Sequence, residues 1–121
     1  MKEVSFFIKD DDTLILVRLT EENPLFERQG GGHTDEGSAY WSEVFSLEDG
    51  EVYYEESDQG RDCDGAHSSY SKRILAKVEP REFVFGGEWC NTPEVKVTAP
   101  GAEWRDIERE ERDFTAESAG Y

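Results

Sequence analysis

The chain of 121 residues suits one domain, and its 29 acidic and 13 basic residues give a formal net charge of -16. A field of that sign repels nucleic acid and anionic membranes, so we expect no direct binding to either, and it attracts basic proteins. The sequence is 36% apolar and holds three Trp, five Tyr and seven Phe, which favours a folded domain over a disordered chain.

The first residues do not resemble a secretory signal. Met1 to Val4 lead into a short apolar segment that Lys9 and three aspartates interrupt. No apolar run approaches the ~20 residues of a membrane-spanning helix. We therefore expect a soluble, cytoplasmic single domain over 1–121, in which Cys63 and Cys90 are reduced thiols.

Two apolar, β-rich runs, VSFFIK (4–9) and TLILVRL (13–19), are separated by three aspartates. Aspartate favours turns, so the pattern predicts a hairpin. Because both faces of 13–19 are apolar, we expect it to be a central strand covered on two sides. Residues 20–38 are polar and glycine-rich, and they predict a flexible loop.

A second hairpin is predicted from AYWSEVFSL (39–47) and EVYYEES (51–57), since Asp-Gly lies between them. The run 39–47 also allows a helix, but the strand is preferred. Residues 68–80 alternate in polarity and predict a further strand.

Short strands are also expected at 81–85 and 93–98, with prolines at the strand boundaries. Around 102–110 an extended segment competes with a helix. Residues 110–119 are rich in helix formers and predict a short helix that Gly120 ends. The expected fold class is α+β, mainly β: an antiparallel sheet of hairpins with a short C-terminal helix.

The negative charge is concentrated in the second hairpin and the loop after it. Residues 37–64 contain nine acidic residues and one basic residue, whereas 65–100 contain four acidic and five basic residues. The candidate partner-binding residues are the nine carboxylates Glu43, Glu48, Asp49, Glu51, Glu55, Glu56, Asp58, Asp62 and Asp64.

Two interpretations of this acidic segment remain open. It is either a solvated face that keeps a small domain soluble, or a mimic of nucleic acid. Phosphates advance ~3.4 Å along each DNA strand, and side chains on one face of a β-strand recur every ~6.7 Å. Alternation places Glu51 and Glu55 on one face and Glu56 and Asp58 on the other.

Metal binding is not predicted. The stretch DCDG (62–65) is similar to part of a calcium-binding EF-hand loop, but Gly60 and Ser71 stand where two ligands are needed. A zinc site would require Cys63, His67, Cys90 and His33 to converge. We expect neither metal nor cofactor.

Catalysis is not predicted either, and no catalytic residue is assigned. Asp62 and Asp64 flank Cys63, and their charge disfavours a thiolate nucleophile. The glycines at 30–32 lack the pattern of a phosphate-binding loop. The segment GRDCDG (60–65) is best explained as a tight turn that Asp62 and Asp64 cap.

Two stretches, GRDCDGAHSSYSK (60–72) and RDFTAESAGY (112–121), resemble small uncharacterised proteins encoded by phages and prophages. Those proteins share a DCDG turn and an RD(Y/F)xAExxGY ending. The resemblance implies a setting in the cytoplasm of a bacterial host, and a structural role in which Phe114 and Tyr121 dock on the sheet. In size and charge the chain is also similar to DNA-mimic anti-CRISPR and anti-restriction proteins.

These observations lead to one functional hypothesis with two alternatives. The chain is expected to be a non-enzymatic, anti-CRISPR-like inhibitor that occupies a basic nucleic-acid-binding channel, first of a CRISPR effector and second of a restriction enzyme. One alternative is an accessory or structural phage protein that binds another protein through aromatic residues such as Trp41, Tyr53 or Trp89. The other is a small zinc-binding domain.

Overall fold

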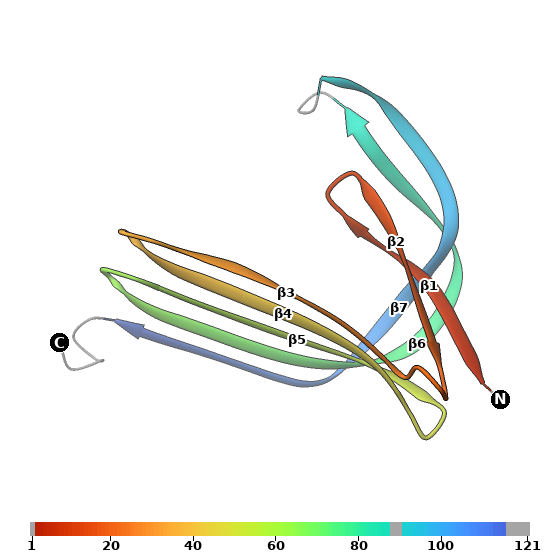
Figure 1. Cartoon of the computed structure of the whole chain (residues 1–121), viewed down its shortest axis with the longest axis horizontal. Coiled ribbons are helices and arrows are strands. Elements are labelled where there is room, and N and C mark those ends of the chain that lie inside the picture. Colours follow the sequence, from red (N-terminus) through yellow and green to blue (C-terminus); the bar gives the residue numbers. More distant parts are fainter. Residues whose placement is uncertain (1, 88–90, 116–121) are drawn as a thin grey trace.

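The computed structural model describes residues 2–87 and 91–115, the last two as backbone. Within these ranges the chain forms one sheet of seven strands and contains no helix (Figure 1). The strands are β1 (Glu3–Asp10), β2 (Thr13–Thr20), β3 (Leu25–Thr34), β4 (Gly37–Glu48), β5 (Glu51–Asp62), β6 (Gly65–Gly87) and β7 (Thr92–Thr115). The expectation of a mainly β protein is confirmed.

The strands lie in the order β2-β1-β7-β6-β5-β4-β3. Every consecutive pair in the sequence from β3 to β7, and the pair β1–β2, is antiparallel. The junction between these two groups is parallel and is made at Phe7 and Gly101. The sheet is therefore mixed, and hairpins supply most of its ladder.

The two longest strands, β6 and β7, bend and give the sheet its curled shape. Figure 1 shows one set of strands, from β3 to the first part of β6, at an angle to a second set that contains β1 and β2. Register shifts in the β6–β7 ladder lie between Lys72 and Arg73 and between Leu75 and Lys77. Such irregularities increase local twist and bend, which explains why the sheet turns here.

Contrary to expectation, Pro80 and Pro100 do not lie at the ends of strands. Pro80 and Pro100 face each other within β6 and β7, past the bend. A proline lacks an N–H group but tolerates extended backbone, so it can lie in a ladder where that donor is not needed. The predicted short strands at 81–85 and 93–98 are thus parts of two long ones.

Both predicted hairpins are confirmed. In the second one, Asp49 and Gly50 have φ values of 50° and 80°, the left-handed conformation that a two-residue hairpin turn requires. The helix alternative for 39–47 is excluded because these residues lie in β4. The prediction that 13–19 is central is wrong: β2 is an edge strand, and Leu16 on its second face is 49% exposed.

The loop expected over 20–38 is largely a strand, because Leu25–Thr34 form β3 and pair with β4. A glycine-rich sequence is typical of flexible loops, which is why a loop is predicted here. In the sheet the glycines make space for aromatic rings instead: a Cβ on Gly30 would lie 2.7 Å from the Trp41 ring, and one on Gly31 would lie 2.7 Å from the Tyr40 ring.

The predicted C-terminal helix is not found in the part of 110–119 that the structure describes. Residues 110–115 continue β7 and pair with residues 65–70 of β6. The helix propensity of Glu and Arg is worth only tenths of a kcal/mol per residue, and a paired strand overrides it. Residues 116–121, which include Tyr121, lie outside the described residues.

The hydrophobic core lies where the two sets of strands face each other. Its buried members are Phe6, Val17, Leu19, Phe45, Leu47, Val52, Tyr54 and Ala102. Trp104 joins them from β7, and its ring centroid lies 5.5 Å from that of Phe6 and 5.3 Å from that of Tyr54. Each fully buried large side chain contributes about 1.5–3 kcal/mol, so this aromatic cluster holds the two sets together.

Beyond the core, strands β3 to β7 continue as a single layer. We call this part the blade; it comprises residues 29–42, 57–70 and 110–115. Its inner face is the one continuous with the core, and its outer face is the opposite one. Because no second layer of described residues covers it, the blade presents both faces to its surroundings (Figure 1).

Candidate functional site

The nine candidate carboxylates are distributed over both faces of the β4–β5 hairpin. Val52 and Tyr54 point into the core, so strand alternation puts Glu56 and Asp58 on the same, inner face. Glu51 and Glu55 alternate to the outer face. The expected division of these four residues is therefore confirmed.

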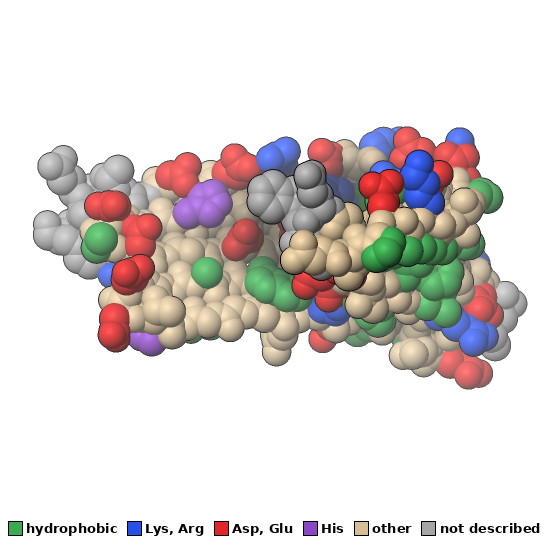
Figure 2. All heavy atoms as spheres, turned by 90° about the horizontal axis from the view of Figure 1, so that it is seen from above, with side chains coloured by type: hydrophobic (Ala, Val, Ile, Leu, Met, Phe, Trp, Pro, Cys, Tyr) green, Lys and Arg blue, Asp and Glu red, His purple; other side chains and the backbone are tan. Residues whose placement is uncertain are grey.

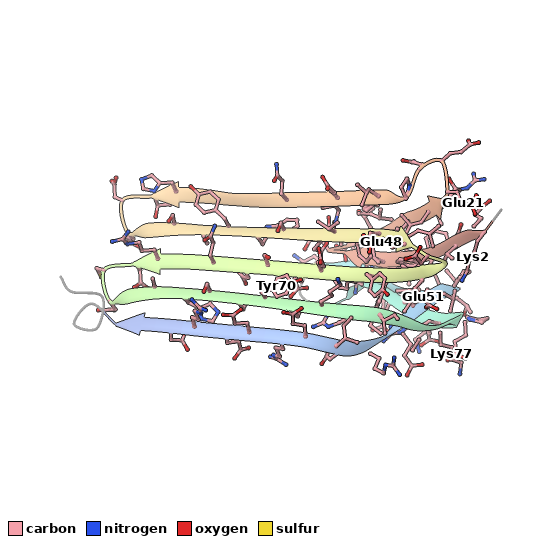
Figure 3. All side chains as sticks on the ribbon, turned by 90° about the horizontal axis from the view of Figure 1, so that it is seen from below. Lys2, Glu21, Glu48, Glu51, Tyr70 and Lys77 are labelled. Atoms are coloured by element: carbon pink, nitrogen blue, oxygen red, sulfur yellow. The ribbon has the colours of Figure 1, made fainter. Side chains whose placement is uncertain are left out.

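The carboxylates are also divided between the two ends of the hairpin. Glu48, Asp49 and Glu51 surround the β4–β5 turn at the core end, where Lys2 donates to the carbonyl oxygen of Gly50 (Figure 3). Asp62 and Asp64 lie at the β5–β6 turn, at the tip of the blade. The 11 residue steps from Glu51 to Asp62 span ~36 Å at ~3.3 Å per residue, so the nine do not form one compact patch.

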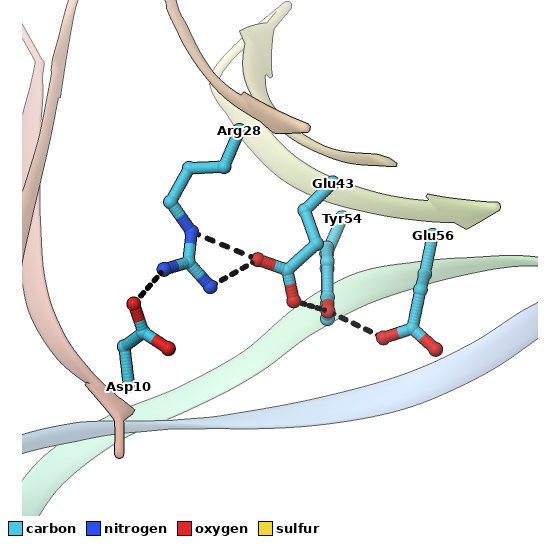
Figure 4. Close-up of polar contacts among 5 residues, drawn as sticks. All are labelled: Asp10, Arg28, Glu43, Tyr54 and Glu56. Atoms are coloured by element: carbon cyan, nitrogen blue, oxygen red, sulfur yellow. Dashed lines mark hydrogen bonds and ion pairs between the residues drawn. The ribbon is translucent and has the colours of Figure 1, made fainter. Parts of the chain in front are cut away.

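Glu43 and Glu56 belong to a polar cluster at the margin of the core (Figure 4). Arg28 donates to Glu43 Oε2 from Nε at 3.0 Å and from Nη2 at 2.6 Å, and its Nη1 lies 3.0 Å from Asp10 Oδ2. The Tyr54 hydroxyl lies 2.7 Å from Glu43 Oε1 and 2.6 Å from Glu56 Oε2. A hydroxyl carries one hydrogen, so it donates to one of the two carboxylates at a time.

The cluster shifts the titration of both Arg28 and Tyr54. Burial lowers the pKa of Arg28, but its hydrogen bonds to Glu43 and the charges of Glu43 and Asp10 outweigh that effect and raise it overall. Burial, and then the bonds to Glu56 and Glu43, raise the pKa of Tyr54 well above its ordinary value. Both groups are therefore locked in their protonated forms, which is typical of a structural network.

Glu55 is also engaged within the protein. On the outer face its Oε1 accepts a hydrogen bond of 3.1 Å from the Tyr70 hydroxyl and lies 3.7 Å from Lys72 Nζ. Three of the nine carboxylates thus have partners that use their charge locally. The remaining six, for which no Lys or Arg partner is found among the described residues, are Glu48, Asp49, Glu51, Asp58, Asp62 and Asp64.

The inner face of the blade is acidic. In the register, Trp41 lies beside Gly30 and Asp58, and this row continues through Ser69 to Glu111 on β7. The next row towards the tip contains Gly32, Ala39, Gly60, His67 and Asp113. Together with Asp62 at the tip, these rows hold four carboxylates and no Lys or Arg among the described residues, although Arg109 of the adjoining row on β7 pairs with Glu111 at an N–O distance of 2.9 Å.

The outer face of the blade differs in charge. Its rows contain mainly Ser, Gln and Tyr side chains, and their charged members are Arg61, Glu110 and Arg112. Arg112 and Glu110 pair with an N–O distance of 2.5 Å. The two faces of one sheet layer therefore carry opposite net charge. Adding the charges along a segment of the sequence does not reveal this difference, because neighbouring residues of a strand point to opposite faces.

His67 brings β6 and β7 together on the inner face. Its Nδ1 lies 2.5 Å from Asp113 Oδ1. That hydrogen bond raises the His67 pKa, desolvation opposes it as the second-largest effect, and the charges of Asp113, Asp58 and Glu111 raise the pKa further, so that it is raised overall. A hollow of about 750 Å³ lies next to this pair, and its lining includes Gly32, Gly60, His67 and Asp113.

Figure 2 looks onto the inner face of the blade, at the left of the view. Much of this surface is tan, which marks backbone and uncharged polar side chains, and red acidic side chains border it. The glycines of β3 and β5 explain the exposed backbone. The hollow beside His67 and Asp113 is an open part of this surface rather than an enclosed pocket.

The segment DCDG forms the predicted turn between β5 and β6. Asp62 Oδ1 accepts hydrogen bonds from the backbone N–H groups of Asp64 and Gly65 at 2.8 and 3.1 Å. Cys63 is exposed at this turn. The residue that caps the turn is Asp62, whereas the second expected cap, Asp64, donates its backbone N–H to Asp62.

The four residues considered for zinc do not converge as far as they are described. By the register, His33 points to the outer face and His67 to the inner face of the sheet. In the described ranges no group of three or more His, Cys, Asp or Glu side chains is placed to hold a metal ion. Cys90 and Trp89 lie outside these ranges.

Comparison with known families, curated proteins and solved structures gave no match to this chain. Across 2–87 and 91–115 there is no helix of the length and apolar character that crossing a membrane requires.

Sequence reasoning missed Glu111 and Asp113 as members of the acidic face. They were assigned to a helix, although Arg109, Glu111 and Asp113 alternate with period two, as on one face of a strand. It also missed Gly32 and Gly60 as parts of a surface, because glycine was interpreted as a sign of loops. The alternation of charged residues with period two was the sequence signal that indicated a strand here.

Proposed function

We propose that the protein is a non-enzymatic inhibitor that presents its acidic sheet to the basic nucleic-acid-binding channel of a host defence complex. A CRISPR effector is the first target class and a restriction enzyme is the second. The observation that carries the proposal is the set of six carboxylates on the β4–β5 hairpin and the turn after it without Lys or Arg partners in the described chain. A surface that keeps so much charge uncompensated favours binding to a cationic partner.

The spacing of these carboxylates supports a resemblance to duplex DNA. The acidic groups at the two ends of the β4–β5 hairpin are ~36 Å apart, and one turn of B-form DNA is ~34–36 Å. Asp58 lies between them on the inner face. A channel that binds one turn of a duplex could therefore contact both ends of the hairpin.

The test is competition with DNA for a purified effector complex. Labelled target DNA, the CRISPR ribonucleoprotein and increasing amounts of this protein are mixed at low salt, and DNA binding is measured by fluorescence anisotropy. We expect displacement of DNA that weakens as salt rises from 50 to 200 mM, since such contacts are screened. Undisturbed DNA binding at low salt, with CRISPR effectors and restriction enzymes alike, would rule out the proposal.

Matched charge-reversal variants separate this binding from simple charge effects. The test variant changes four acids of the β4–β5 hairpin to Lys, and the control changes four acids elsewhere. The test set is Glu48, Glu51, Asp58 and Asp64, and the control set is Glu21, Glu22, Glu82 and Glu94. Both change the net charge equally, so loss of inhibition in the test variant alone supports the proposal.

A second candidate function is that of an accessory protein that binds through aromatic residues. Tyr40 and Trp41 are 47% and 41% exposed, on opposite faces of β4, and this exposure favours it. Binding of that kind would survive the charge reversal and would be lost in Tyr40→Ala or Trp41→Ala. The competition assay with these variants distinguishes the two functions.

A further inference from the structure

We propose that the inner face of the blade is a docking surface for a segment of a protein partner that bears arginine and lysine. This inference deepens the proposed function, on which it rests, by naming the face that binds and the chemistry that it recognises. It is carried by an uncovered sheet face, two glycines that the fold does not require, an exposed tryptophan, and a difference in charge between the two faces.

The first observation is that the face has no cover. Strands usually bury at least one face, but beyond the core both faces of the blade are free of any second layer among the described residues. Next to the core, the row that contains Arg28, Glu43 and Glu56 still packs in the polar cluster. Past that row, the neighbours of the inner face within 2–87 and 91–115 are side chains of its own strands.

The second observation concerns Gly32 and Gly60. Neither has a positive φ, and an added Cβ would meet no atom within 4 Å at Gly32 and one atom, at 3.7 Å, at Gly60. Glycine within a strand weakens it, and commonly marks a place where another backbone or a ligand approaches closely. Backbone geometry and packing do not explain these two glycines, whereas close approach of a partner does.

The third observation is Trp41, which lies in the row next to Gly32 and Gly60 and can anchor a partner there. Its ring lies over Gly30, and the Arg28 guanidinium lies 5.6 Å from the ring centroid. The side chain is fixed by these contacts and yet 41% of the residue is exposed. Partly exposed, preorganised tryptophans are frequent among the residues that dominate binding energy at interfaces.

Charge identifies the occupant. The inner face of the blade carries Asp58, Asp62, Glu111 and Asp113, whereas the outer face carries two Arg and one Glu. Glu111 pairs with Arg109 of the adjoining row at 2.9 Å and Asp113 pairs with His67, so Asp58 and Asp62 are the carboxylates of this face without a cationic partner among the described residues. Spacings of ~5 Å between strands and ~7 Å along them set these carboxylates at distances that arginine and lysine side chains of one segment can span. A second copy of this acidic chain would meet like charge here.

The size of the face fits a segment better than a globular surface. Five strands at ~4.8 Å and three rows at ~6.7 Å give an area of about 480 Å². A standard interface buries about 800 Å² on each partner. The face alone is therefore suited to one basic helix or extended segment, and the acidic turn at the core end would contact other parts of the partner.

The experiment measures binding of a fluorescein-labelled peptide of arginine, lysine and alanine to the full chain by anisotropy. Gly32→Val and Gly60→Val each place a side chain in the open space above the glycine without a change in charge. Ser57→Val is the control, since Ser57 is exposed on the outer face of the same strand as Gly60. We expect about tenfold weaker binding for the two glycine variants and less than twofold change for Ser57→Val.

A second pair of variants tests the contribution of charge. Asp58→Asn with Asp113→Asn removes two charges from the inner face, and Glu48→Gln with Glu51→Gln removes two at the core-end turn. We expect about tenfold weaker peptide binding for the first pair and less than threefold for the second. Circular dichroism and thermal unfolding of every variant confirm that the fold is retained, and Gly60→Ala replaces any valine variant that does not fold.

Three outcomes would overturn the inference. One is equal weakening by both charge pairs together with unchanged binding in the glycine variants, because binding would then follow overall charge. Another is loss of binding in Ser57→Val, which would place the site on the outer face. The third is a self-association in sedimentation experiments that Gly60→Val abolishes, which would make a second copy the occupant. The peptide assay contains no effector or DNA, so it can succeed while the competition assay fails, and the reverse.

Discussion

The contact between Arg28 and Glu43 should be the most important ion pair for stability. Their side chains are 19% and 18% exposed, whereas Arg18 and Glu3, which form a comparable pair, are 63% and 46% exposed. Fully exposed pairs contribute ~0–1 kcal/mol, and breaking a buried pair costs ~3–5 kcal/mol. We therefore expect Arg28→Met to lower the free energy of unfolding by about 2 kcal/mol, part of it from the lost contact with Trp41.

The assay is a double-mutant cycle in urea, followed by circular dichroism. Glu43→Gln alone should cost about 1 kcal/mol, and the double variant should cost less than the two single variants together, with a coupling of about 1–2 kcal/mol. Arg18→Met is the control and should cost less than about 0.5 kcal/mol. The reasoning is refuted if Arg28→Met costs no more than Arg18→Met, or if the coupling is zero within error.

Three further predictions concern turns and titration. Gly50→Ala should cost about 1 kcal/mol in urea, because φ at this turn is 80°. The His67 pKa, measured by NMR, should lie above 6.5 and move towards 6.5 in Asp113→Asn; the stabilisation from this pair is complete below about pH 6.5 and is lost as pH rises through the raised pKa. Asp62→Ala should cost about 1 kcal/mol by removing the turn cap, whereas exposed Cys63→Ser should change stability by less than about 0.5 kcal/mol; equal effects of these two would contradict the assigned cap.

Local signals in the sequence were sufficient to predict structure where a short turn directly connects two paired strands. Aspartates after residue 9 and Asp49-Gly50 identified the two predicted hairpins, and GRDCDG was correctly predicted as a turn, which the structure places between β5 and β6. In each case the residues that determine the turn are the residues that form it. Alternation then placed Glu56 and Asp58 on one face.

Sequence signals led to wrong predictions for segments whose structure depends on residues of another strand. Residues 110–115 favour a helix by composition, but β6 offers them a complete ladder, and pairing of that kind is not encoded locally. The glycines of β3 looked like a loop because the aromatic rings that lie over them come from β4. The acidic face could not be predicted for the same reason, since half of its carboxylates come from β7.

The position of Trp104 has a consequence for how the chain folds. Its ring contacts Phe6, Phe45 and Tyr54, which come from three strands made much earlier during synthesis. The hairpins can form as they emerge, but the core stays open until β7 inserts between β1 and β6. Closure of such distant contacts is slow, and the unpaired edges of β1 and β6 are exposed to aggregation in the meantime. The high negative charge makes these partly folded chains repel one another until β7 has joined the sheet.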